Sequence, residues 1–487
     1  MKISSAWYGN DRDRLSLIVG GIGGVVGLIL GALAGVQPIL LGLAIFASVF
    51  IICFFTYFEQ TVLGLLILRS SLDIFSAQQI PAIFALGFDA LTVLYVVFML
   101  LIGREIKTDK FWWFFAGWVG LQGLWLILMF FGELGLDSSY LPRSIREFVR
   151  IFSWLMGYLL VMQLKDKISP NRFINILMFS LVAPLFIAFL QLVLPNGMLP
   201  SMLVYATDPG LYVAGEGSRV FGTLGHPNGL AKFLFLFIAL TWWQWDRSGK
   251  RWYWLLLLST LVFFLVATQA LFAIAMFGVF VMVRMSQQLS LSRLIAGALL
   301  LVVFIALFAS TEAGLERLNS IADTPLLNRD LNISQAILLS EGNSFNWRIA
   351  QWTYLLQAWA KYPIFGYGLN ASPTIPIYYN YAHNDYLRAL LEGGIVGFIS
   401  FIAFMGGQLV YLIRLYIKSR PGSDARRLHS IMLAVLLSFL IGMTTDNTWS
   451  NTVVHFYWWS ILAVAGWNWE RSDKNLSSKQ LVERQNF

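Results

Sequence analysis

Charged residues and cysteine are scarce in this sequence of 487 residues. Only 12% of the residues are charged, and the single cysteine, Cys53, excludes an intrachain disulfide and a cysteine-based zinc or iron–sulfur site. The four histidines do not have the spacing of metal ligands, so we expect neither a metal nor a cofactor. These histidines are His226, His383, His429 and His455.

Apolar residues are abundant: 58% of the chain is hydrophobic and it contains 19 tryptophans. This composition is typical of a polytopic membrane protein, so we expect one integral membrane domain over residues 1–487. The net charge of +8 comes from short Lys and Arg clusters between apolar runs, which indicates membrane topology and not a nucleic-acid partner. The expected surroundings are therefore a lipid bilayer.

Apolar runs of about 20 residues, the length that crosses a hydrocarbon core of about 30 Å, predict an all-α protein with about 12–14 transmembrane helices. The weakest run contains Arg69 and Asp73. It either crosses the bilayer or is broken or re-entrant, which membranes tolerate only against protein or a cavity. The predicted spans are 15–36, 38–58, 60–78 (the weak run), 82–103, 111–131, 147–164, 173–194, 227–245, 252–268, 269–284, 292–311, 386–413, 428–445 and 451–468.

The connectors between spans alternate in charge. Basic connectors and both termini are expected in the cytoplasm, including a disordered tail over 470–487. Polar, acidic or Gly/Pro-rich connectors are expected outside: 132–142, 195–226, 310–382 and 444–451. The sequence thus predicts a plasma membrane protein with a long outward-facing loop at 310–382.

The connector that ends near residue 232 carries a possible anion site. Pro227 suits the first turn of a helix, and this helix is expected to begin at the outer surface, where its free N–H groups point outward. Arg219 and Lys232 are close by in sequence. Alternatively, Gly-His-Pro-Asn is only a turn and Arg219 only an anchor for lipid headgroups.

Within the long loop, residues 346–362 have helical spacing, with Trp352, Leu355, Leu356 and Trp359 three and four residues apart. We expect an amphipathic helix on the outer membrane surface. Arg348 lies in its first turn, away from the C-terminal end that favours cations. This placement indicates an external anion, although a solvated Arg on such a helix is the more common situation.

The hinge at 381–397 joins this loop to a long apolar helix. His383 precedes a helix start at Asn384 or Asp385, and Arg388 and Glu392 are four residues apart on one face. One interpretation is a helix cap with a surface ion pair. The other is a site in which Arg219, Arg348 and Arg388 converge on one anion, with His383 as a proton-transfer group.

Three motifs in this order resemble the bacterial O-antigen ligase and O-antigen polymerase superfamily. They are Arg-x-x-Gly-x-x-x-x-Pro-Asn at 219–228, Asn-Trp-Arg-x-x-x-Trp at 346–352 followed by Pro-x-x-Gly-x-Gly at 363–368, and His-Asn-x-Tyr-Leu at 383–387 with Glu-x-Gly at 392–394. The resemblance covers most of the chain and is strongest over 219–398. It implies a metal-independent glycosyltransferase of the polytopic GT-C type.

The resemblance also implies substrates and residue roles. The donor would be a glycan on undecaprenyl diphosphate, and the acceptor a sugar hydroxyl on another lipid-linked glycan or on a lipid core. Arg219 and Arg348 would bind the diphosphate, and His383 would be the base, with Asn384 or Asp385 orienting its ring. Arg388 and Asn228 are further candidates for substrate binding.

One position departs from the family pattern. Members often carry a Ser-Arg or Thr-Arg pair at the outer end of a span before the long loop, whereas this chain has Thr268 and Gln269 there. Gln269 can donate hydrogen bonds but carries no charge, so one diphosphate contact would be weaker or come from elsewhere, such as Arg219, Arg388 or Arg150. A small-solute transporter, for example of inorganic carbon, is the alternative function, but the polar residues of the spans are too scattered to form a clear path.

Overall fold

The computed structural model describes residues 38–204, 219–249, 251–286, 291–310, 315, 344–375 and 380–469. These residues form helices joined by turns, with no strand among them, so the predicted all-α fold is confirmed. The predicted span at 15–36 and the tail at 470–487 lie outside the described residues.

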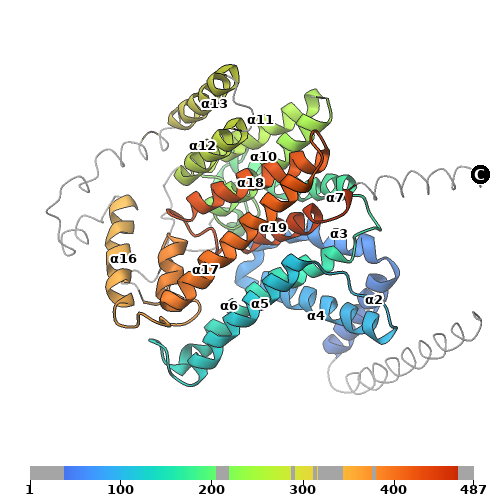
Figure 1. Ribbon diagram of the computed structural model, residues 1–487, viewed down its shortest axis with the longest axis vertical. Coiled ribbons are helices and arrows are strands. Elements are labelled where there is room, and N and C mark those ends of the chain that lie inside the picture. Colours follow the sequence, from blue (N-terminus) through green and yellow to red (C-terminus); the bar gives the residue numbers. More distant parts are fainter. Residues whose placement is uncertain are drawn as a thin grey trace, which may run out of the picture.

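The helices follow the predicted apolar runs closely, and Figure 1 shows their arrangement. In chain order they are α2 (Pro38–Thr56), α3 (Phe58–Arg69), η1 (Asp73–Gln78), α4 (Ile80–Leu101), α5 (Lys110–Phe130), η2 (Ser138–Tyr140), α6 (Leu141–Met162), α7 (Pro170–Leu177), η3 (Met178–Leu181), α8 (Val182–Val193), η4 (Asn196–Met198), α9 (Ser201–Val204), α10 (Pro227–Arg247), α11 (Trp252–Ala267), α12 (Leu271–Ser286), α13 (Leu291–Ala309), α16 (Ser344–Trp359), α17 (Asp385–Lys418), α18 (Asp424–Gly442) and α19 (Thr452–Ala465).

Five of the described helical segments are long and apolar enough to cross a membrane, or six if the bent pair α2–α3 counts as one span. The five are Ile80–Leu101, Lys110–Phe130, Pro170–Val193, Asp385–Lys418 and Asp424–Gly442. Shorter apolar helices include Trp252–Ala267 and Thr452–Ala465. The chain is therefore a polytopic membrane protein, while the total of about 12–14 spans and the direction of each crossing stay predictions.

The weak run at 60–78 is not a continuous helix. Its helix α3 ends at Arg69, and the 3₁₀ helix η1 begins at Asp73. Just before the run, the chain bends by 118° between Ala47–Thr56 and Phe58–Arg69. The guanidinium of Arg69 is buried and lies 2.7 Å from the Asp73 carboxylate. Ser70, which follows the break, donates a hydrogen bond to the Ser180 carbonyl at 2.7 Å and accepts one from Thr223 at its own carbonyl. The charged and polar groups of this run are thus satisfied within the protein.

The core is centred on α19, whose residues from Val453 to Ala465 are all buried. It packs against α6 and α10, and α10 packs in turn against α18. Buried aromatic rings fill these interfaces; for example, Trp154 of α6 lies edge to face with Trp449, at 4.9 Å between ring centroids. This packing holds two irregular segments: the turn before α10 and the loop over 443–451 that joins α18 to α19.

The helix α17 is broken near its start, and a loop is fastened to the break. Gly394 has a φ of +61°, which side chains of L residues rarely adopt. The N–H groups of Tyr367 and Gly368 donate to the carbonyls of Leu391 and Glu392 at 3.0 and 2.9 Å. As Figure 1 shows, α16 packs beside the first turns of α17. The break therefore ties α16 and the loop after it to the segment that carries His383.

Candidate active site

The carboxylate of Asp446, in the loop between α18 and α19, forms the centre of a buried polar cluster. Its Oδ2 lies 2.5 Å from the Lys232 ammonium, and its Oδ1 accepts a hydrogen bond from the Asn228 amide at 3.0 Å. Lys232 also donates to the Asn447 carbonyl at 3.0 Å. Burial opposes ionisation of Asp446, but Lys232 and His383 outweigh it and hold the pKa of the carboxyl well below its ordinary value.

His383 lies against this carboxylate. Its Nδ1 is 3.5 Å from Asp446 Oδ1, and its side chain is only 10% exposed. The backbone of His383 has a φ of +48°, and its N–H donates to the Asn447 side-chain oxygen at 2.7 Å. Burial lowers the pKa of His383 below its ordinary value, so the imidazole is neutral at pH 7. A neutral ring with Nδ1 toward a carboxylate leaves Nε2 as a proton acceptor.

The first turn of α10 supplies the other side of the cluster. His226 is the N-cap of this helix, because its Nδ1 accepts a hydrogen bond from the Asn228 N–H at 3.0 Å. Burial lowers the pKa of His226 to about 3, so this ring is neutral and serves as a cap. Pro227 stands at the first helical position, as predicted.

Arg219 is joined to the cluster through Asn228. Its Nη2 donates to Asn228 Oδ1 at 3.2 Å, and its Nε donates to the Thr268 carbonyl at 2.9 Å. Arg219 therefore reaches the turn that contains Thr268. Gln269 follows in that turn, buried and with a φ of +51°.

Arg348, a residue of α16, lies near His383. Its positive charge is one of the influences that lower the pKa of the His383 imidazole, after burial. The neighbouring Trp347 packs edge to face on the imidazole, with 5.4 Å between ring centroids. The structure thus brings His383 and Asn228 to the Asp446 carboxylate, while Arg348 acts on His383 and Arg219 binds Asn228.

Arg388 belongs to a second buried cluster. Its guanidinium donates to Glu147 at 2.6 Å, to Glu392 at 3.1 Å and to the Ser450 hydroxyl at 2.8 Å. The Glu147 carboxylate is also paired with Arg150. The surface pair expected for Arg388 and Glu392 is therefore a buried network, and these three contacts commit Arg388 to holding α17, α6 and the 443–451 loop together.

Asn384 and Asp385 accept hydrogen bonds from backbone N–H groups, and their role in orienting the His383 ring stays a prediction. The Asn384 side chain is the N-cap of α17 and accepts hydrogen bonds from the N–H groups of Tyr386 and Leu387, both at 3.0 Å. The Asp385 carboxylate accepts one from the Trp449 N–H at 2.8 Å. Asp446 takes the place beside the imidazole because the packing of α18 and α19 turns their connecting loop inward.

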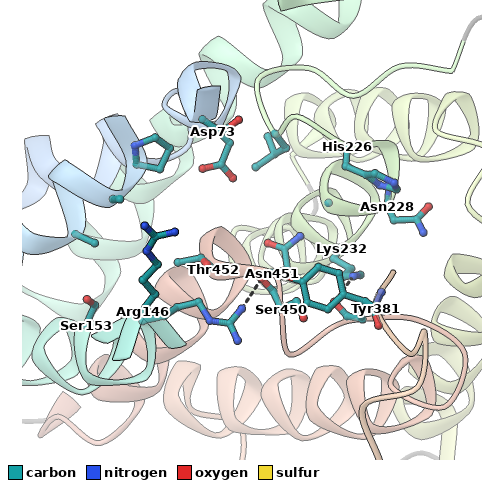
Figure 2. Close-up of a pocket in the computed structure, with 18 of the residues that line it drawn as sticks. Asp73, Arg146, Ser153, His226, Asn228, Lys232, Tyr381, Ser450, Asn451 and Thr452 are labelled. Carbon is teal, nitrogen blue, oxygen red and sulfur yellow. Dashed lines mark hydrogen bonds between the residues drawn. The ribbon is translucent and has the colours of Figure 1, made fainter. Parts of the chain in front are cut away.

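A cavity of about 800 Å³ opens beside the Asp446 cluster. His226, Asn228 and Lys232 lie at one end of it, and Arg146 and Ser153 lie across from them (Figure 2). His383, Asp446 and Tyr381 also line this space. Within the described residues, no group of three or more His, Cys, Asp and Glu side chains could hold a metal ion.

Sequence reasoning missed Asp446 and Glu147. The only sequence signal for Asp446 was an acidic residue in a short polar connector, 444–451, which was predicted to lie outside. Lys232 was considered only as a residue close to Arg219. Glu147 gave no signal, because its partner Arg388 is 241 residues away in the sequence.

Part of the chain is similar to a known protein family. Residues 254–402, which run from α11 into α17, match a family model described as O-antigen ligase. The matched part contains Gln269, Arg348 and His383, whereas Arg219 and Asp446 lie outside it. A comparison with curated proteins gave no match. These findings give the transporter alternative no support, and the match over residues 254–402 supports the O-antigen ligase and polymerase superfamily of membrane glycosyltransferases.

Proposed function

We propose that the protein transfers a glycan from undecaprenyl diphosphate to a sugar hydroxyl of an acceptor, at the outer face of the bacterial plasma membrane and without a metal ion. The observation that carries the proposal is the pairing of His383 with Asp446 in a cavity that also holds Lys232. A base, its orienting carboxylate and cations are the groups that such a displacement needs.

In this proposal, Nε2 of His383 takes the proton of the acceptor hydroxyl while the hydroxyl oxygen attacks the anomeric carbon of the donor. The bond from that carbon to the diphosphate oxygen breaks, and undecaprenyl diphosphate leaves with the electron pair. Asp446 keeps the proton of the neutral ring on Nδ1 and stabilises the imidazolium that forms.

The leaving diphosphate gains negative charge as the bond breaks, so cations fixed beside it stabilise the transition state more than the bound donor. Arg348 lowers the pKa of His383 through its charge, Lys232 is paired with Asp446, and Arg219 donates a hydrogen bond to Asn228, a partner of Asp446. We assign the diphosphate to this end of the cavity. Because a diphosphate leaves as an anion, the reaction requires no second carboxylic acid.

The test is transfer of a labelled glycan from undecaprenyl diphosphate to a panel of acceptors, by the purified chain in nanodiscs with a metal chelator present. We expect product from the parent chain and from Arg143→Gln, an exposed arginine of α6 whose side chain bonds Thr374. We expect none from His383→Ala and a large loss for Arg348→Ala. Equal product from His383→Ala would contradict the proposed base, and dependence on added metal would contradict the metal-independent step.

A further inference from the structure

The cavity extends well past the His383 end. Figure 2 shows Arg146 and Ser153 on the side opposite His226 and Lys232. We call this part of the cavity, where the lining residues come from α4 and α6, the second arm. A volume of about 800 Å³ is at the upper end of the range for small-molecule pockets, so there is room for groups beyond one diphosphate.

Each helix presents one stripe to this arm. From α6 the lining residues are Ile145, Arg146, Val149, Arg150 and Ser153, which recur at one, three and four residues and so share a face. From α4 they are Pro81, Ala82, Ala85 and Leu86, all apolar and mostly small. The second arm therefore has one apolar wall from α4 and one wall from α6 that mixes apolar, polar and basic residues.

Of the cations that line the cavity, three are already paired. Arg69 is bound to Asp73, Lys232 to Asp446, and Arg150 to Glu147. Arg146 makes no hydrogen bond or ion pair with any residue in the part of the chain that the structure describes, and its side chain is exposed to the cavity. It is thus available to a ligand.

Large apolar side chains are exposed beside Arg146. Leu86 is 57% exposed and Ile145 is 43% exposed, and both line the cavity. An arginine next to apolar walls matches an amphiphile, whose anionic group the guanidinium can bind with two parallel hydrogen bonds and whose chain the walls can cover.

We propose that this arm binds the acceptor, and that the acceptor is an anionic amphiphile with a phosphate group held by Arg146 and its hydrocarbon chain along α4 and α6. The inference rests on the proposed function, because it uses the donor site at the other end. The donor diphosphate must lie at the reacting carbon near His383, so a phosphate in the second arm belongs to the other substrate. The base then lies between the two lipid-linked groups.

Binding is tested without any transfer. The purified chain in phosphatidylcholine nanodiscs is photolabelled with a diazirine-bearing dodecyl phosphate, and the labelled peptides are mapped. We expect labels on 81–86 and 145–149, reduced at least tenfold by Arg146→Gln and unchanged by Arg143→Gln. Labels only around α10 and the 443–451 loop, or labels insensitive to Arg146→Gln, would overturn the inference. So would full competition by phosphatidylglycerol in the nanodisc, since the site would then be one for bulk anionic lipid.

The kinetic test separates the two substrates. With a phosphorylated lipid-linked acceptor, Arg146→Gln should raise the acceptor KM about tenfold and leave the donor KM and the rate at saturating acceptor unchanged. With the same acceptor lacking its phosphate, the parent chain and the variant should behave alike. A rise in the donor KM instead would overturn the acceptor site while the transferase function stands. If the parent chain transfers nothing, the proposed function fails, and photolabelling still decides whether the arm binds the phosphate amphiphile.

Discussion

Nδ1 of His383 and Oδ1 of Asp446 lie 3.5 Å apart, although 63 residues separate them in the sequence. The same carboxylate is paired with Lys232 through its other oxygen. One buried carboxylate therefore lies beside the imidazole and also neutralises an ammonium that has only 3% of its side chain exposed.

Replacing Asp446 by Asn should lower the transfer rate by roughly 10²–10⁴-fold, the range of a general base that has lost its support. Rates at saturating donor and acceptor check this. Asp166→Asn is the matched control, because Asp166 pairs with Lys107 in a half-exposed bridge away from the cavity. A rate for Asp446→Asn within threefold of the parent would show that His383 acts without this carboxylate.

The ion pair between Lys232 and Asp446 makes a separate prediction about stability. Lys232→Met leaves the carboxylate buried without its cation, which costs about 3–5 kcal/mol for pairs of this kind. The double variant Lys232→Met with Asp446→Leu should recover a substantial part of that loss, since no charge is then left unpaired. Unfolding midpoints in detergent measure both; additive losses would show that the two groups do not interact.

The pH profile of transfer should show an acidic limb set by His383. Burial lowers the pKa of His383 below its ordinary value of 6.5, so the base is neutral at pH 7. The rate should therefore fall only when the pH drops below this lowered pKa. Asp446 raises the pKa of His383 and Arg348 lowers it. In Asp446→Asn the limb should therefore move to lower pH, and in Arg348→Gln to higher pH. Profiles of kcat/KM check both directions, and shifts of the same sign would contradict the arrangement.

Arg388 should behave as a structural residue and not as a substrate ligand. Arg388→Gln removes the guanidinium that pairs with both Glu147 and Glu392. Because these two carboxylates are buried, we expect a loss of about 3–5 kcal/mol in stability. The donor KM of the protein that remains folded should be unchanged. Arg414→Gln, an exposed position of the same helix, is the control. A raised donor KM with normal stability would restore the sequence-based prediction that Arg388 binds substrate.

Gly394→Ala should detach the loop from the break in α17. A Cβ there would collide with the Ile364 backbone, and a φ of +61° is strained for any side chain, so we expect a cost of at least about 1–3 kcal/mol. Gly406→Ala, in the same helix with open space around it, should be neutral or stabilising. Proteolysis of the 363–368 loop should accelerate only in Gly394→Ala; equal resistance in both variants would show that the break does not hold the loop.

Hydropathy predicted the helices well because a bilayer imposes one length and one composition on each span. The run expected at 227–245 is Pro227–Arg247, and that at 111–131 is Lys110–Phe130. Motif spacing also located His383, Arg219 and Asn228, whose side chains meet or approach one carboxylate. The carboxylate itself could not be predicted, because nothing local tells which polar residue of a short connector will be turned inward by the packing of two helices.

The surroundings of Arg388 could not be predicted for the same reason. Its spacing from Glu392 predicts a pair, and the pair exists, but its burial depends on Glu147 from a distant helix. Similarly, Asn384 and Asp385 are adjacent to His383 in sequence, yet the positive φ of His383 and the start of α17 direct their side chains to backbone N–H groups instead. Adjacency along the chain was a poor guide to contact where the backbone turns.

The loop over 443–451 has a practical consequence for anyone who exchanges parts between relatives. It supplies the imidazole's carboxylate, the amide that holds the His383 backbone, and the hydroxyl bound by Arg388. Yet it lies some 40 residues beyond the matched segment 254–402, and Lys232 lies before that segment begins. A chimaera cut at the boundaries of the match would carry His383 without the Asp446 and Lys232 of this chain. Keeping the whole Asp446 cluster together in a swap therefore means transplanting 219–247 and 443–455 with the matched segment.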